Sequence, residues 1–469
     1  MKRFLALGLG LCLFLIIPGC GDTFRPIIIP NPPVFPNPAA AHTVVSINDN
    51  GTIVPGSAMV IDVSGDAAVS EVNVGLAPVY ALQQSANAAL VVNHSVTGAT
   101  ADSLTKLSFS STVISGSVTI SLPPNSAPNF VAAAPSAGTA YVTLPNYTPP
   151  SVGVVNTQSN NLVETIPVGN NPYAVAVTPD NKKLYVANQA DSTISGFNTS
   201  DRSPRVGSPV STTSPPIWLT ARSDSQAVYV LETSGTLGWL NTTSTAGPDT
   251  FTELPINVPG ATFLVYDPNL NRLYIPGGEQ LAMVDVSQSP PQYLAGGPIT
   301  ICGLASASAS CIPTVSPSSR ATTDPCSLTS AQTLTIVAVA ALPNGISAYV
   351  GAYYEDSNNN LCPQVTTINT VSNTVVSSTA VPGFPDATIP SSSYYAPVCA
   401  TTRFRFMMAA GGDSTRAYLA SCDGGMVNII DTSDDAYILN LPAPLGVRPP
   451  VPPNPDNQSQ NPVFMFAGP

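Results

Sequence analysis

Residues 171–199 read NPYAVAVTPDNKKLYVANQADSTISGFNT. Large apolar residues alternate with small ones over 173–177, and a period of two is typical of a β-strand. A Pro-Asp-Asn turn at 179–181 leads into a second apolar run, KKLYVAN, and a third run follows. Asp180 and Asp191 fall at turns between the runs, so we expect them to shape hairpins rather than to form a site.

The same order of runs returns along the chain at a spacing of about 44 residues. The second run recurs around Leu90, Tyr141, Tyr185, Tyr229, Tyr274, Tyr349 and Tyr418, the last two after expanded intervals. A fourth run, such as ETIPVG at 164–169, completes each copy. Four short antiparallel strands at this period are typical of one β-propeller blade. The 49 prolines and 33 glycines, with only 9% charged residues, fit a turn-rich, all-β fold.

The number of blades depends on how the ends of the repeat region are counted. The segment 461–469 has the pattern of a first strand, and 42–49 has the pattern of a second. We therefore predict seven to eight four-stranded antiparallel blades over 42–469, closed by N- and C-terminal strands, with a Pro-rich connector at 442–462. Seven blades with an accessory hairpin is the alternative to eight.

The sequence of residues 171–199 resembles the YVTN-type β-propeller repeat. A typical copy has an Ala-Val-rich strand, Pro-Asp-Gly, a Leu-Tyr-Val-Ala/Thr-Asn strand and a strand ending in Ile-Asp-Thr. Asn181 stands where Gly is usual, and the other copies over 58–441 are degenerate. The resemblance, to lactonase-like and surface-layer-like propellers, implies the architecture. It also implies one candidate activity, because lactonase-like seven-bladed members hydrolyse sugar-acid lactones.

The chain begins with two basic residues and an apolar run over 4–17, which is short for a transmembrane helix. We predict a signal peptide over 1–19. Ile-Pro-Gly-Cys at 17–20 resembles the bacterial lipobox, with an unusual proline, and implies a bacterial lipoprotein lipidated at Cys20; a secreted protein in which Cys20 is incidental is the alternative. Residues 20–41 are rich in proline and predict a semi-rigid tether. We expect an exported cell-envelope lipoprotein, at the outer membrane, on its periplasmic side or at the cell surface.

Six cysteines follow position 20, all in the C-terminal third: Cys302, Cys311, Cys326, Cys362, Cys399 and Cys422. Export places them in an oxidising compartment, so we predict disulfides. Zinc ligation is the alternative, but no Cys-x-x-Cys occurs and both histidines lie far away in sequence. Proximity suggests the pairs Cys302–Cys311, Cys326–Cys362 and Cys399–Cys422, among fifteen connectivities.

The two expanded intervals contain the long segments 296–332 and 381–402, the first with cysteines and the second with Tyr394 and Tyr395. Segments of this length without a clear pattern are often functional. If both emerge on one face of the propeller they shape a binding surface, and Tyr394 and Tyr395 are our candidates for contacts with a partner.

Motifs that carry catalysis are missing. A Ser-His-Asp triad would depend on His94, since His42 lies next to the tether, and His94 is better interpreted as a polar residue at a strand end. Two acidic pairs, Glu355-Asp356 and Asp434-Asp435, are thin candidates for calcium, and the first is better interpreted as a solvated hairpin tip. Trp218 is expected in a blade core, as is Trp239. We therefore predict no catalytic residues, no metal and no cofactor.

The formal net charge of −12, with only 15 basic residues spread along the chain, argues against binding to nucleic acid. Two classes of function remain: a non-catalytic scaffold, expected as a monomer, that binds a protein or glycan at the cell surface, or a lactonase-like hydrolase. The first predicts a channel lined by Ser, Thr, Ala and backbone. The second predicts carboxylates or His94 in the channel mouth, and three or more ionisable side chains there would contradict the first. Whether the protein is an enzyme stays open, and we prefer the non-catalytic hypothesis.

Overall fold

The computed structural model describes residues 42–51, 54–94, 102–110, 113–135, 138–294, 297–304, 324–326, 333–386, 399–400, 402–446 and 459–468. The chain divides into two units, Met1–Ala39 and Ala40–Pro469, and the described residues belong to the second. The predicted signal peptide, Cys20 and most of the connector lie outside the described residues, so these assignments stay predictions.

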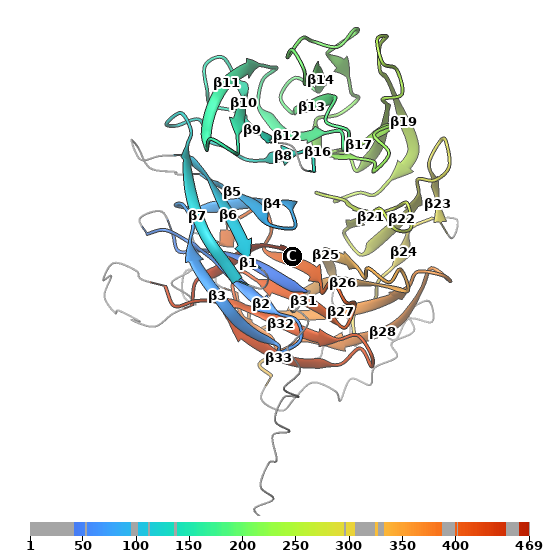
Figure 1. Ribbon diagram of the computed structural model, residues 1–469. Helices are drawn as coiled ribbons and strands as arrows, with labels where there is room; N and C mark the ends of the chain where they lie inside the picture. The colour runs from blue at the N-terminus through green and yellow to red at the C-terminus, as the bar shows by residue number, and fades with distance from the viewer. Residues whose placement is uncertain are drawn as a thin grey trace, which may run out of the picture. The chain divides into compact units, whose positions relative to one another are not determined.

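The described residues form eight antiparallel sheets, each with a path of four neighbouring strands, and almost no helix (Figure 1). We number the sheets as blades 1 to 8. Blades 1 to 4 contain β4 (Pro78–Ser85), β5 (Ala88–Asn93), β6 (Ser103–Ser110) and β7 (Val113–Ser121); β8 (Val131–Ala133), β9 (Thr139–Leu144), β10 (Ser151–Asn156) and β11 (Asn161–Pro167); β12 (Pro172–Val177), β13 (Lys183–Asn188), β14 (Thr193–Asn198) and β15 (Val210–Ser211); and β16 (Pro216–Ala221), β17 (Ala227–Glu232), β18 (Thr236–Asn241) and β19 (Thr250–Asn257).

Blades 5 to 8 contain β20 (Val265–Asp267), β21 (Arg272–Gly277), β22 (Gln280–Asp285) and β23 (Gln292–Tyr293), with β24 (Ile299–Thr300) added beside β22; β25 (Thr335–Ala341), β26 (Ser347–Glu355), β27 (Asn360–Asn369) and β28 (Thr374–Ala380), with β29 (Phe384–Pro385) added beside β27; β30 (Phe406–Ala410), β31 (Arg416–Ser421), β32 (Met426–Asp431) and β33 (Tyr437–Pro442); and β34 (Asn461–Ala467), β1 (Thr43–Asp49), β2 (Ser57–Asp62) and β3 (Ala67–Asn73). The prediction of four-stranded antiparallel blades is confirmed, and the number is eight.

Blade 8 is built from both ends of the described chain. Its order is β3-β2-β1-β34, so the C-terminal strand pairs with β1 as the innermost strand. In Figure 1 the blue strands β1, β2 and β3 lie beside the orange and red strands of blade 7, and β34 packs against β30 on one side and β4 on the other. The predicted closure by N- and C-terminal strands is therefore confirmed.

The second strand of each blade is the most buried because it has a neighbouring strand on each edge and a blade on each face. Its Tyr positions, at 141, 185, 229, 274, 349 and 418, are all at most 1% exposed. Fourth strands such as β7 alternate between exposed and partly buried residues, as expected at an outer edge. The repeated Tyr thus fills the space between neighbouring blades.

The channel between the blades is filled by aromatic rings. Six of them close a circle with centroid distances of 4.0–6.1 Å between neighbours: Tyr80, Phe130, Trp218, Phe263, Phe404 and Phe464. All six are at most 8% exposed. Edge-to-face and offset pairs of this kind stabilise by about 0.5–1.5 kcal/mol each beyond their burial. The expectation of a channel lined by Ser, Thr, Ala and backbone is wrong, because large side chains meet at the axis.

Two disulfides lie in the described residues, Cys326–Cys362 and Cys399–Cys422, as predicted from proximity. Cys311 lies outside the described residues, so the pair Cys302–Cys311 stays a prediction. Disulfides are typical of exported proteins. None of the helices among the described residues has the length and apolar character needed to cross a membrane.

Candidate functional site

A cavity of about 460 Å³ opens at the end of the channel where the first strands of blades 5, 6 and 7 begin. We call it the mouth cavity. Its lining residues are Gly260, Thr262, Phe263, Gly278, Thr335, Ile336, Val337, Cys399, Ala400, Thr402, Arg403, Phe404, Arg405 and Phe406. The volume lies in the range of pockets that bind small ligands or one group of a larger partner.

Arg403 lies between this cavity and the aromatic ring circle. Its guanidinium carbon is 4.2 Å from the ring centroid of Tyr173, 5.3 Å from that of Phe130 and 5.8 Å from that of Trp218. The Nε of Arg403 donates a long hydrogen bond of 3.4 Å to the hydroxyl of Tyr173. Both Nη atoms are buried, and neither has a hydrogen-bond partner among the described residues. The positive charge is therefore held by aromatic faces, while up to four N–H donors are unused.

Arg405 differs from Arg403 because carboxylates hold it. Its Nε and Nη2 donate to Asp423 at 2.7 Å, and Nη2 also donates to Asp386. Burial lowers the pKa of Arg405, but the hydrogen bonds and charges of Asp423 and Asp386 outweigh burial and hold this pKa above its ordinary value. The side chain keeps 22% exposure and lines the cavity, where its charge is compensated by these two carboxylates.

Of the two predicted insertions, the second contributes to the mouth cavity. From the second, Cys399 lies in the cavity wall and is linked to Cys422 at the start of the β31–β32 turn. The first insertion does not line the cavity in the described residues; its Asp324 accepts a hydrogen bond from the backbone N–H of Gly383 in the second insertion, which brings the two insertions together. The disulfides therefore fix the parts of these insertions that the structure describes.

The ionisable side chains that line the mouth cavity are Arg403 and Arg405, and no carboxylate is among the described lining residues. Asp386 and Asp423 lie behind Arg405 and are paired with it. Two is fewer than the three converging groups that would contradict a binding role.

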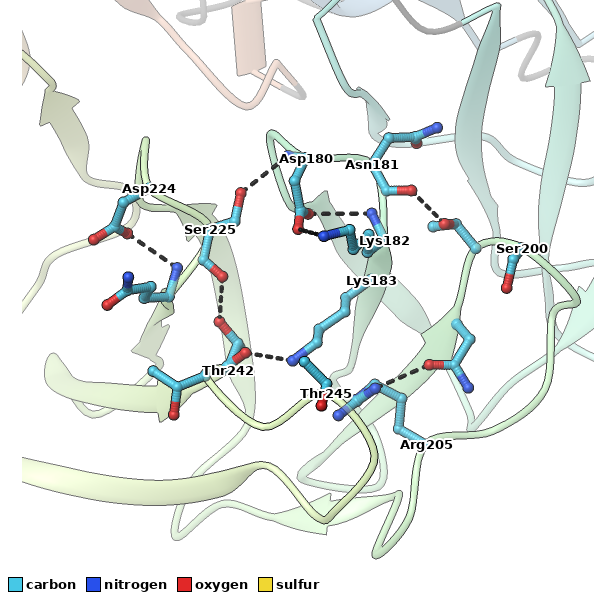
Figure 2. Close-up of a pocket in the computed structure, with 14 residues that line it drawn as sticks. Asp180, Asn181, Lys182, Lys183, Ser200, Arg205, Asp224, Ser225, Thr242 and Thr245 are labelled. Carbon is cyan, nitrogen blue, oxygen red and sulfur yellow. Dashed lines mark hydrogen bonds and ion pairs between the residues drawn. The ribbon is translucent and has the colours of Figure 1, made fainter.

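A second cavity of about 360 Å³ lies at the seam between blades 3 and 4, and Figure 2 shows its lining. Lys183 points into the seam, where its Nζ donates to the carbonyls of Thr242 and Ser244 and lies 3.2 Å from Asp249. Arg205 donates to both carboxylate oxygens of Asp249.

The buried charges of this seam satisfy one another. All three donors of Lys183 have partners, and burial lowers its pKa while Asp249 partly restores it. Tyr185 adds a hydrogen bond of 2.7 Å to Asp249. Because these donors are already used within the protein, the seam joins two blades, and we do not assign it as the site.

The histidine and acidic candidates are placed away from the mouth cavity lining. His94 follows β5, and burial lowers its pKa with a partial opposing effect of Asp102. Asp435 accepts hydrogen bonds from the hydroxyls of Tyr349 and Ser377, so it links blade 7 to blade 6. The hairpin tip is exposed at 355 and 357–359, as expected, but Asp356 itself is 5% exposed, caps its own turn and lies beside Cys326 of the first insertion.

The remaining predictions divide between confirmed and undescribed positions. Asp180 and Asp191 lie in turns, where Asp180 accepts from the N–H of Lys182 and Asp191 from that of Asn170. Trp218 belongs to the central ring circle, whereas Trp239 is only partly buried. Tyr394, Tyr395 and Cys20 lie outside the described residues.

The sequence analysis did not single out Arg403 and Arg405. One signal could have found them: the segment that leads into β30 reads RFRF at 403–406, where no other copy has a charged residue. Two charges at the entrance of a strand that lines a channel are unusual for a purely structural position.

Comparison of this chain with solved structures finds proteins of similar fold at low sequence identity. The chain is similar to apo AztD from Citrobacter koseri, with a TM-score of 0.55 at 11% identity over 91% of this chain and 98% of that one. It is also similar to the dihydro-heme d1 dehydrogenase NirN, with a TM-score of 0.56 at 10% identity over 86% of this chain and 73% of that one. A proposed 6-phosphogluconolactonase from Bacteroides uniformis gives 0.50 at 11% identity, over 91% and 99%.

At these identities the likeness shows the fold alone. The fold is a β-propeller. No model of a known protein family matches the chain, and no curated protein matches it. The lactonase-like neighbour fits the resemblance seen in the sequence at the level of architecture, and function must be argued from the mouth cavity.

Proposed function

We propose that this protein is an exported, non-catalytic β-propeller that binds a carboxylate-bearing group of an envelope partner in the mouth cavity. The observation that carries the proposal is Arg403, whose two buried Nη atoms have no hydrogen-bond partner among the described residues. A buried cation with unused donors is unfavourable unless an acceptor is supplied. A carboxylate supplies two acceptor oxygens in the geometry that guanidinium prefers.

The rest of the cavity supports a partner with an apolar body next to its charge. Phe263, Phe404 and Phe406 provide flat walls, while Thr262 and Thr402 provide hydroxyls. One residue of a uronic-acid glycan or one acidic side chain of a peptide matches the volume and chemistry. Because both Nη atoms are covered, a ligand reaches them only when a neighbouring side chain shifts.

Lactone hydrolysis is less well supported. It needs a base or nucleophile at the reacting carbon, and the side chains that line the cavity are two arginines, threonines and apolar groups. Arginine keeps its proton at all relevant pH values and does not act as a base. The lining can therefore orient and bind an anion, and binding is the function that these residues favour.

Binding can be measured by isothermal titration of galacturonate and of a short Asp/Glu peptide. We expect saturable binding of one of them, weakened by about 10–100-fold in Arg403→Met, since a hydrogen-bonded charge contributes about 1.5–3 kcal/mol. Val337→Phe should also weaken binding by filling the cavity while leaving both arginines. Arg202→Met is the matched control, because Arg202 pairs with Glu164 on the surface.

The same proteins should be tested for hydrolysis of glucono-δ-lactone. We expect a rate no higher than that of buffer. Hydrolysis that is lost in Arg403→Met, or carboxylate binding that is equal in Arg403→Met and Arg202→Met, would overturn the proposal.

We further propose that the protein is held in the cell envelope through lipid on Cys20. Radioactive palmitate should label the wild type, and Cys20→Ala should abolish the label and release the protein from membranes. A protein that stays membrane-bound and labelled after this substitution would contradict lipidation at Cys20.

A further inference from the structure

Two cysteines and a carboxylate meet at the tip of the long β26–β27 hairpin, outside the mouth cavity. The sulfur atoms of Cys326 and Cys362 and a carboxylate oxygen of Asp356 all lie within 4.8 Å of one another. The two sulfurs form a disulfide in this structure. Two sulfur ligands and one oxygen ligand are a donor set that suits zinc.

The three groups are buried and held in place by the surrounding backbone. Cys362 is fully buried, Cys326 is 9% exposed and Asp356 is 5% exposed. The carboxylate of Asp356 accepts hydrogen bonds from the backbone N–H groups of Asn358 and Asn360 at 2.9 Å, which fixes its orientation. In metal sites, hydrogen bonds of this kind to a ligand side chain fix the orientation of that ligand.

Space beside Cys326 is kept open by a glycine. A Cβ at Gly383 would lie 2.0 Å from the sulfur of Cys326, so any other residue there would have to displace the sulfur. The backbone N–H of Cys326 donates to Asp324, and the N–H of Gly383 donates to the same oxygen. The position of Cys326 is thus set by the meeting of both insertions.

We infer that this disulfide is a redox-controlled zinc site. A thiol reductant supplies two electrons and two protons, the S–S bond breaks, and the reductant is oxidised to its own disulfide. Zn²⁺ then displaces the two thiol protons and binds two thiolates and the Asp356 carboxylate, with water as the fourth ligand. Tetrahedral Zn–S bonds of about 2.3 Å place two sulfurs about 3.8 Å apart, so the two cysteines must separate after reduction.

The other described disulfide provides an internal comparison. Cys399–Cys422 is similarly buried, but no carboxylate joins it in a group of three possible ligands among the described residues. Instead of a carboxylate, the side-chain amide of Asn461 lies beside it and donates to the sulfur of Cys399. Reduction of this pair gives two thiols without a third ligand, so we expect it to bind zinc much more weakly.

The test uses the full chain, reduced with a phosphine and then titrated with Co²⁺ as a spectroscopic probe and with Zn²⁺ in competition. We expect one equivalent of Co²⁺ with the thiolate charge-transfer and visible bands of a tetrahedral site, and no such bands in the oxidised protein. Cys326→Ser/Cys362→Ser should lose the site, while Cys399→Ser/Cys422→Ser and Cys302→Ser/Cys311→Ser should keep it.

Asp356→Asn separates the ligand from the fold. The amide oxygen of the introduced side chain can still accept from the N–H groups of residues 358 and 360, so these two turn hydrogen bonds are kept, while the hydrogen bond from the Asn360 side chain and the negative charge are lost. We expect Zn²⁺ affinity to fall by at least about tenfold, and circular dichroism of each variant checks that it folds. Absence of tetrahedral bands in reduced, folded wild type would overturn the inference, as would equal loss in the two control pairs or unchanged affinity in Asp356→Asn.

Discussion

Asp249→Asn should destabilise the propeller more than any other single loss of an acidic partner between blades. The Asp249 side chain is 5% exposed and accepts hydrogen bonds from Arg205, Lys183 and Tyr185 of blade 3. Breaking one partner of a buried ion pair costs about 3–5 kcal/mol, because the remaining charge is left in a poor solvent.

The structure narrows this range toward its lower end. After the substitution, Lys183 still donates to two carbonyl oxygens, and Arg205 still donates to the carbonyls of Ser244 and Gly247. The introduced amide also keeps one acceptor oxygen at position 249. We therefore expect the free energy of unfolding to fall by about 3 kcal/mol.

Substitutions of two other carboxylates give reference values for this loss in the free energy of unfolding. Asp435→Asn removes a carboxylate that accepts from the neutral hydroxyls of Tyr349 and Ser377, and we expect a loss of about 1–2 kcal/mol. Glu164→Gln removes the surface partner of Arg202, where the side chains are 44% and 30% exposed, and we expect less than about 1 kcal/mol.

Urea unfolding followed by tryptophan fluorescence measures the series, because both tryptophans lie on strands of blade 4. Circular dichroism must give the same midpoint if unfolding is two-state, and the slope with denaturant must be unchanged if only stability has changed. The reasoning is refuted if Asp249→Asn is no more destabilising than Glu164→Gln, or if 1 M salt erases its effect, since salt screens exposed charges more than buried ones.

Three further outcomes are expected. Burial raises the pKa of Glu232, which has one buried oxygen without a partner among the described residues, so its charged form costs stability at neutral pH and this cost is relieved as pH falls. Thermal melts from pH 7 to pH 4 should show a smaller gain in Glu232→Gln than in wild type, and equal slopes would contradict this. Cys399→Ser/Cys422→Ser should lower the free energy of unfolding by about 3 kcal/mol, because the disulfide closes a loop with a sequence separation of 23; urea midpoints measure this. Truncation after Gln460 removes β34 with its buried Val463, Phe464 and Met465, whose burial contributes about 1.5–3 kcal/mol each. We expect the product to be insoluble or to be unfolded by circular dichroism. Removal of Pro469 alone should have no effect.

The architecture could be predicted because its signals are local and repeated. A second strand with a central Tyr recurs at a nearly constant interval, and a Tyr packed between blades needs the same neighbours in every copy. The closure by β34 and β1 was also predictable, since an incomplete copy at each end leaves strands that need a partner.

The mouth cavity could not be predicted in the same way, since it depends on residues that differ between copies. Phe404 and Phe263 are far apart in sequence, and only the ring of blades brings their centroids to 5.7 Å. The same holds for Arg403, whose contact with Tyr173 joins blade 7 to blade 3 across the channel. A sequence pattern shows which residues enter a channel but not which of them meet at its axis.

The pairing register of the first and second strands of the blades explains where the mouth cavity and Arg403 lie. In blade 1, Tyr80 pairs with the second-strand residue two positions after Leu90. In blade 4, Trp218 pairs with the second-strand residue two positions after Tyr229. Both side chains belong to the ring circle. At the same register, blades 3 and 6 have Ala174 and Ala338. In both blades the residue before the alanine reaches the channel instead: the Tyr173 ring stacks on the guanidinium of Arg403, and Val337 lines the mouth cavity. The binding site we propose therefore lies where blades 3 and 6 depart from the aromatic pattern of blades 1 and 4.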